Sequence, residues 1–145
     1  MFKRSWVEID LDTIVRNYEI CKGLLRPGQE VMAVVKADAY GHGDVQVAYA
    51  LQSAGVRHFA VSNADEAGNL RQAGIRGQVL ILGYTPLSAV DELRRYDITQ
   101  ALLSEEYAEQ FAGTGVKAQF AIDTGMNRIG LDWFDPENCE RVIRK

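Results

Sequence analysis

Short apolar runs alternate along the chain with segments in which apolar residues recur every three or four positions. The first pattern is typical of buried strands, and the second is typical of helices with one apolar face. Strands are predicted at residues 6–9, 31–35, 58–61, 78–82, 98–102 and 116–122. Helices are predicted at residues 11–25, 44–54, 64–73, 86–95, 104–111 and from 136 onward.

Residues that start or stop helices support these boundaries. Gly55 and Gly74 each follow a helical segment, while Pro86 and Pro136 stand where helices can begin. Ser104 is a candidate cap for the helix that follows it. Alternation of strand and helix with short connections predicts right-handed crossovers and a parallel sheet. The pattern alone leaves open whether the sheet is an open doubly wound sheet or a closed barrel.

Composition narrows the class of protein. Apolar residues make up 47% of the chain and charged residues 25%, as in ordinary globular domains. A net charge of −4 without a basic cluster argues against a nucleic-acid partner. The chain lacks a signal-peptide pattern and an apolar run near the roughly 20 residues of a membrane span, so we expect a cytoplasmic protein with no membrane segment. Cys21 and Cys139 lack metal-ligand spacing, and we expect two reduced thiols and no metal site.

The segment 31–43 carries the strongest candidate chemistry. An unbroken apolar run ends at Lys36, which leads into a glycine-rich loop containing Gly41 and Gly43. Apolar surroundings disfavour the charged form of a lysine and make it a nucleophilic amine that can form a Schiff base. The alternative is a strand-end lysine whose charged tip reaches solvent.

Two segments resemble the signatures of one enzyme family. Val35-Lys36-Ala37-Asp38-Ala39-Tyr40-Gly41-His42-Gly43 is similar to the pyridoxal-phosphate lysine segment of bacterial alanine racemases. Asp123-Thr124-Gly125-Met126-Asn127-Arg128-Ile129-Gly130 resembles a second N-terminal signature of that family. The order and separation of the two segments also fit, and the resemblance extends from residue 6 to the last residues.

The resemblance implies an α/β fold, namely the N-terminal part of a parallel (β/α)8 barrel with about five strands. The first barrel strand would end at Lys36, and strand 6–9 would belong to a C-terminal β domain. Because such a barrel needs roughly 250 residues, we expect the 145 residues to be an N-terminal fragment. The remaining barrel strands and most of the β domain would then be absent. The open strand edges of such a fragment favour self-association.

The resemblance also implies roles for individual residues. Lys36 would carry pyridoxal 5′-phosphate as an internal aldimine and act as acid and base on one face of the substrate. Tyr40 would hydrogen-bond the cofactor phosphate, and Arg128 would bind a cofactor ring oxygen and the substrate carboxylate. A tyrosine from the partner subunit of a homodimer would serve the other face, from a region beyond these residues. His42 and His58 are expected to be structural.

One position departs from the family pattern. Many members carry, two residues before the aspartate of the second signature, a carbamylated lysine that orients the arginine. Ala121 occupies that position here, so an anion is expected to hold Arg128, or Arg128 is held less tightly.

The implied activity is the interconversion of L- and D-alanine, which supplies D-alanine for peptidoglycan. A serine racemase of the same family remains an alternative substrate class. A non-catalytic barrel protein that binds pyridoxal phosphate is an alternative of another class, and the segment 123–130 argues against it. The fragment alone is expected to be inactive.

Overall fold

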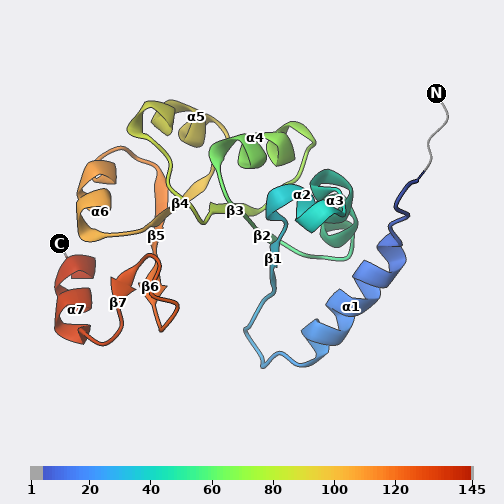
Figure 1. The fold of residues 1–145 in the computed structure, drawn as a ribbon, viewed down its shortest axis with the longest axis horizontal. Helices are drawn as coiled ribbons and strands as arrows, with labels where there is room; N and C mark the ends of the chain where they lie inside the picture. The colour runs from blue at the N-terminus through green and yellow to red at the C-terminus, as the bar shows by residue number, and fades with distance from the viewer. Residues whose placement is uncertain (1–4, 145) are drawn as a thin grey trace.

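The computed structural model describes residues 5–144, whose main element is one parallel five-stranded sheet. The spatial order of its strands is β1-β2-β3-β4-β5, and every neighbouring pair is parallel. Helices line the outside of the arc of strands (Figure 1). The strands are β1 (Met32–Val34), β2 (His58–Val61), β3 (Gln78–Ile81), β4 (Thr99–Leu102) and β5 (Lys117–Phe120). These strands confirm five of the six predicted from the sequence.

Helices lie between successive strands of the sheet, as the alternating pattern predicts, and one further helix stands at each end of the described residues. They are α1 (Leu11–Gly23), α2 (Lys36–Gly41), α3 (Asp44–Ser53), α4 (Ala64–Gln72), α5 (Val90–Arg95), α6 (Glu105–Phe111) and α7 (Pro136–Arg144). Side chains cap four of them: Asp10 accepts a hydrogen bond from Thr13 N–H, Asn63 caps α4, Ser104 caps α6, and Asp135 accepts from Asn138 N–H at the start of α7. The prediction of Ser104 as a cap is confirmed.

The sheet buries apolar side chains on both of its faces. Phe59, Val61, Val79 and Ile81 belong to the main core between strands and helices. The residues that alternate with them on the other face form a smaller cluster of Ala60, Leu80 and Ala101. Burial on both faces explains why the strands read as continuous apolar runs. The smaller cluster lies on the face opposite the helices, which is the interior of a barrel.

The segment 6–9 is not a strand, and this prediction is wrong. No strand within residues 5–144 pairs with it, so its backbone lacks the neighbour that a sheet requires. Two of its three apolar side chains lie open to solvent, since Trp6 is 69% exposed and Val7 is 79% exposed, whereas Ile9 is half-buried.

Two other boundaries differ from prediction. The predicted strand 116–122 divides into β5 and β6 (Ile122–Asp123), because Ala121 ends the pairing with β4 and then meets β7 (Leu131–Asp132). Ala121 N–H donates to Leu102 O, whereas Ala121 O accepts from Leu131 N–H. The predicted helix 86–95 begins with the 3-10 turn η1 (Leu87–Ala89), and α5 starts only after it.

A close backbone approach before β3 gives a test of the fold. Gly77 has φ +78°, and a Cβ there would lie 2.2 Å from Arg57 O. Gly74 has φ +85° but open space around its Cβ position. We expect Gly74→Ala to cost about 1–2 kcal/mol of unfolding free energy, from the left-handed backbone alone. We expect Gly77→Ala to cost roughly a further 1–3 kcal/mol, because the backbone must shift. Urea unfolding measures the loss of stability in each variant. Equal unfolding midpoints for Gly74→Ala and Gly77→Ala would show that the close approach of Arg57 O adds no cost at Gly77.

Candidate active site

Lys36 lies at the carboxyl edge of the sheet, directly after the first strand. Val35 N–H donates to Ala60 O at 2.9 Å, so pairing with β2 continues up to the residue before the lysine. The Lys36 side chain is half-buried, which is intermediate between the apolar surroundings and the exposure to solvent that the sequence allows. Because all five strands are parallel, their carboxyl ends meet at this edge. In parallel barrels this edge carries the active site.

The chain after Lys36, within the segment labelled α2, forms a left-handed turn in place of the glycine-rich loop expected from the sequence. Ala37, Asp38, Ala39 and Tyr40 have φ values of 52°, 56°, 48° and 57°. Each L-residue in this conformation costs about 1–2 kcal/mol, and such residues normally occur singly. Strained backbone of this kind persists only where surrounding contacts hold it, and it gathers at functional sites.

Backbone and side-chain hydrogen bonds close this turn from within. Ala39 N–H donates to Val35 O at 3.0 Å, and Gly43 N–H donates to Asp38 O at 2.9 Å. The Asp38 carboxylate accepts from Asp44 N–H at 3.0 Å, which ties the turn to the start of α3. The turn is therefore fixed at its start and at its end.

Glu66 links the turn to the neighbouring strand, and sequence reasoning missed it. Its Oε1 accepts from Ala37 N–H at 2.9 Å, while its Oε2 accepts from Ser62 N–H at 2.7 Å and from the Ser62 hydroxyl at 2.8 Å. Burial raises the pKa of this carboxyl group, but hydrogen bonds from Ser62 and Ala37 and the charge of Lys36 outweigh it, so the pKa is lowered. The signal in the sequence was the spacing Asn63-x-x-Glu66, which is typical of a helix capping box.

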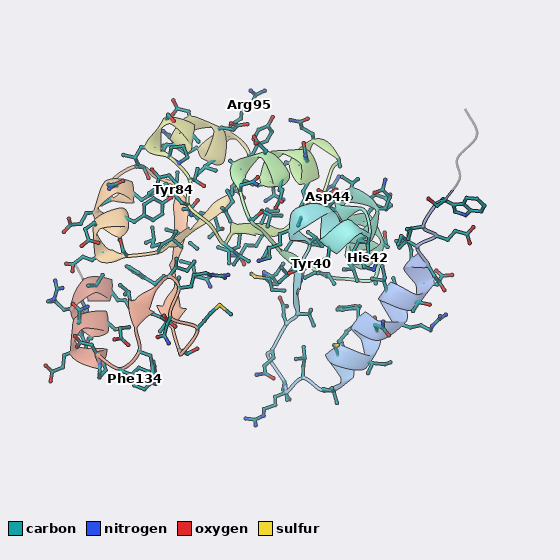
Figure 2. The ribbon with its side chains drawn as sticks, viewed as in Figure 1. Tyr40, His42, Asp44, Tyr84, Arg95 and Phe134 are labelled. Carbon is teal, nitrogen blue, oxygen red and sulfur yellow. The ribbon has the colours of Figure 1, made fainter. Side chains whose placement is uncertain are left out.

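Tyr40 and His42 follow Lys36 in the same segment (Figure 2). The Tyr40 side chain is 61% exposed, so its hydroxyl is open to a ligand. Nδ1 of His42 lies 2.9 Å from Ala39 O, and a carbonyl only accepts, so Nδ1 carries a hydrogen. This contact gives His42 a structural task in closing the turn.

Arg128 lies in the loop between β6 and β7, which continues from the carboxyl end of β5. Asp123 shapes this loop by accepting hydrogen bonds from Asn127 N–H at 3.0 Å and Gly125 N–H at 2.9 Å. These two backbone donors lower the pKa of the Asp123 carboxyl group. The Arg128 side chain is exposed and has no hydrogen-bond or ion-pair partner within residues 5–144. Lys36 and Arg128 thus both follow the carboxyl ends of the two outermost strands of the sheet, Lys36 directly after β1 and Arg128 in the loop that continues from β5.

Ala121 lies where the chain passes from β5 to β6 and is half-buried. Its backbone is committed to the Leu102 and Leu131 hydrogen bonds, at 3.0 and 2.8 Å. Gly130 packs against it so closely that a Cβ on Gly130 would lie 2.9 Å from Ala121 O. The methyl side chain of Ala121 offers no charged or polar group toward Arg128.

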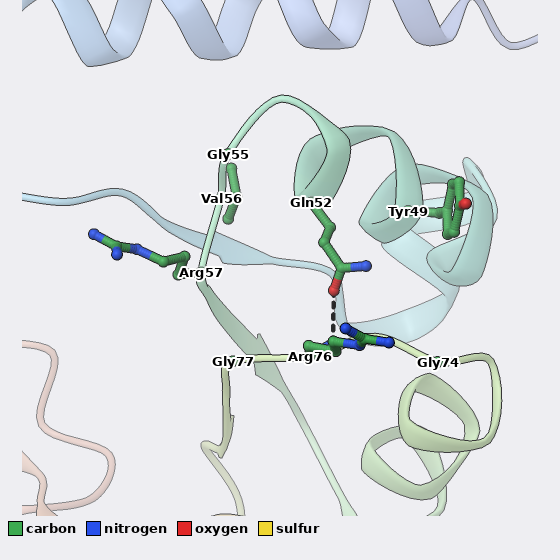
Figure 3. A pocket seen from close by; sticks show the side chains of 8 residues that line it. All are labelled: Tyr49, Gln52, Gly55, Val56, Arg57, Gly74, Arg76 and Gly77. Atoms are coloured by element: carbon green, nitrogen blue, oxygen red, sulfur yellow. Dashed lines mark hydrogen bonds between the residues drawn. The ribbon is translucent and has the colours of Figure 1, made fainter.

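A large cavity lies at the opposite edge of the sheet. It has a volume of about 730 Å³ and is lined by residues that include Tyr49, Gln52, Arg57 and Arg76 (Figure 3). Arg57 immediately precedes β2, so the cavity is at the amino ends of the strands. Gln52 Oε1 accepts from Arg76 N–H at 2.6 Å and ties the α3 helix to the start of β3. In barrels of this kind, residues at the amino ends of the strands contribute to stability and the active site lies at the carboxyl ends. This cavity is therefore separate from the site at Lys36.

Fold and site together define a parallel α/β barrel segment with a lysine at the carboxyl end of its first strand. Residues 9–145 match the model of the alanine racemase N-terminal domain, and the chain belongs to that family. Its five parallel strands match the N-terminal part of alanine racemase barrels. An alanine racemase of Clostridium difficile 630 in complex with cycloserine superposes with a TM-score of 0.86 at 33% identity, over 98% of this chain and 41% of that one.

Curated relatives extend the comparison. Alanine racemase 1 of Clostridium acetobutylicum is 44% identical over 132 residues, which are 87% of this chain and 34% of that protein. The serine/alanine racemase of Enterococcus gallinarum is 40% identical over 131 residues, which are 89% of this chain and 19% of that protein. The chain therefore spans about a third or less of the length of these relatives. No helix within the described residues is long and apolar enough to cross a membrane.

Proposed function

We propose that this chain forms part of the barrel of an alanine racemase that uses pyridoxal 5′-phosphate bound to Lys36. The observation that carries the proposal is the position of Lys36, at the carboxyl end of the first strand and followed by a strained, hydrogen-bonded turn. Membership of the alanine racemase family supports the reaction class.

The donors at this edge fit pyridoxal phosphate. Lys36 offers a primary amine to the cofactor aldehyde, and the exposed Tyr40 hydroxyl can donate to its phosphate. The guanidinium of Arg128, which has no partner among residues 5–144, suits an anionic oxygen, because its planar donors match carboxylate and phosphate groups. The three residues thus offer an amine, a hydroxyl and a guanidinium, which suit the aldehyde and phosphate of the cofactor and the carboxylate of an amino acid.

The proposed mechanism divides the work between these residues. When bound, pyridoxal phosphate acts as an electron sink for negative charge at the substrate Cα. Lys36 Nζ moves a proton on the face of the D enantiomer, as a general acid and base. Arg128 holds the substrate carboxylate and a cofactor oxygen, so that Cα stays in line with Lys36. A tyrosine of the partner subunit in a homodimer moves the proton on the other face.

A cytoplasmic role in supplying D-alanine for peptidoglycan accompanies this proposal. A second candidate substrate is serine, since one relative at 40% identity is named a serine/alanine racemase. The segment 123–130 favours a racemase over a non-catalytic barrel that only binds the cofactor.

Racemisation assays of two proteins test the proposal. We expect the full-length protein that contains this chain to convert L-alanine to D-alanine when supplied with pyridoxal phosphate, and the same assay with L-serine tests the second candidate substrate. We expect the 145-residue chain alone to form no D-alanine, because the second acid/base lies elsewhere. It should also self-associate in sedimentation experiments, because the edges of β1 and β5 are open to pairing. A monomeric 145-residue chain with normal activity, or a full-length protein without activity, would contradict the proposal.

A further inference from the structure

We infer that Glu66 is a positioning residue for Lys36, because its carboxylate holds the peptide group that joins Lys36 to the left-handed turn. This inference rests on the proposed function of Lys36. It assigns a task in the active site to a residue that belongs to another strand–helix unit and lies outside both signature segments.

The two oxygens of Glu66 serve two different segments. Oε1 accepts from Ala37 N–H at 2.9 Å, and that N–H belongs to the same peptide group as Lys36 C=O. Oε2 accepts from both the N–H and the hydroxyl of Ser62, at 2.7 and 2.8 Å. The carboxylate thus ties the end of the first strand to the end of the second, and it fixes the backbone from which the Lys36 side chain extends.

The chemistry of these contacts requires a carboxylate. Three donors converge on Glu66, and only an ionised carboxyl group accepts at both oxygens. A glutamine of the same shape would direct its NH2 group at either Ala37 N–H or the Ser62 donors, and donor would face donor. The left-handed turn that follows is strained at four successive residues, so losing its first anchor lets it relax.

Glu66 is also in the first turn of α4, and a purely structural role as a helix cap is the competing explanation. Asn63 separates the two explanations. Its side chain accepts from Glu66 N–H at 2.9 Å and caps the same helix, but no hydrogen bond joins its side chain to residues 36–40. Asn63→Ala therefore weakens the helix start and leaves the anchor of the turn in place.

The experiment compares Glu66→Gln with Asn63→Ala in the full-length protein. Hydrogen–deuterium exchange of the peptide that covers residues 36–43 is measured first, without cofactor. We expect Glu66→Gln to accelerate exchange there by about tenfold or more, and Asn63→Ala to leave it unchanged. The dissociation constant of pyridoxal phosphate, followed by the visible absorption of the bound cofactor, should rise by a similar factor in Glu66→Gln only.

The outcomes separate this inference from the proposed function. Exchange and cofactor affinity that match the wild type in Glu66→Gln overturn the inference, and so do equal changes in both variants. A wild-type protein that binds no pyridoxal phosphate overturns the proposed function instead. The exchange measurement then still reports whether Glu66 anchors the turn.

Discussion

Replacing Lys36 with alanine in the full-length protein is expected to lower the rate of alanine racemisation by a factor on the order of 10³ or more. The loss is large because one amine is proposed both to hold the cofactor and to move the proton on one face. Lys22→Ala and Lys117→Ala are matched controls and should retain activity. Lys22 pairs with Glu19 at the end of α1, and Lys117 pairs with Asp97 at the amino end of β5.

Chemical labelling tests the same residue without relying on activity. Borohydride reduction of the cofactor-loaded protein should fix a pyridoxyl group on the peptide that contains Lys36. Mass mapping that places the group on Lys22 or Lys117 would show that the assignment of Lys36 is wrong.

The sheet was predictable from the sequence because parallel strands covered on both faces read as continuous apolar runs. The run 58–61 predicts β2 without error, and the runs 31–35, 78–82 and 98–102 predict strands that differ by a residue at one or both ends. Helix ends followed from glycines and from the cap at Ser104, since these are local signals.

Other elements depend on contacts between distant segments, which a local pattern does not contain. Trp6 and Val7 have the composition of a strand, but within residues 5–144 no neighbouring strand pairs with them. The division of 116–122 arises at Ala121, where the carbonyl turns from β4 toward Leu131. Neither the missing strand partner of residues 6–9 nor the division at Ala121 can be read from the residues of these segments themselves.

The candidate site was predictable in part. Lys36, Tyr40 and Arg128 came from motif resemblance, and the parallel sheet explains why Lys36 and Arg128 share one edge although more than ninety residues of chain separate them. The left-handed turn was not foreseen, because alanine and tyrosine rarely adopt this backbone and only Gly41 and Gly43 suggested positive φ. Glu66 was missed because its contact with Ala37 spans 29 residues of sequence.

The second large effect is expected at Arg128. Arg128→Ala in the full-length protein should lower the racemisation rate by about 10²–10³, the usual loss when one donor to a charged centre is removed. The expected loss is large because the exposed guanidinium has no side-chain or backbone partner in the part of the chain that the structure describes. Its donors are therefore available to the substrate carboxylate and the cofactor. Arg128→Lys should recover only a fraction of the loss, because an ammonium lacks the planar pair of donors.

We expect Ala121 to make the racemase activity of the full-length protein sensitive to anions near Arg128. Ala121 carries only a methyl group where a carbamylated lysine would supply a negative charge, so a small anion such as chloride is expected to hold the guanidinium in place. Replacing chloride with gluconate at constant ionic strength should therefore lower the activity of the full-length protein. Ala121→Lys should reduce this dependence, because a carbamylated lysine supplies the negative charge covalently.

The control for Ala121→Lys is Ala121→Met, which adds similar bulk at this half-buried position without a charge. We expect Ala121→Met to keep the chloride dependence of the wild type and Ala121→Lys to lose most of it. If each of the three proteins, the wild type and both variants, is equally active in chloride and in gluconate, then no anion holds Arg128. The guanidinium would then be positioned by the cofactor and the substrate carboxylate alone.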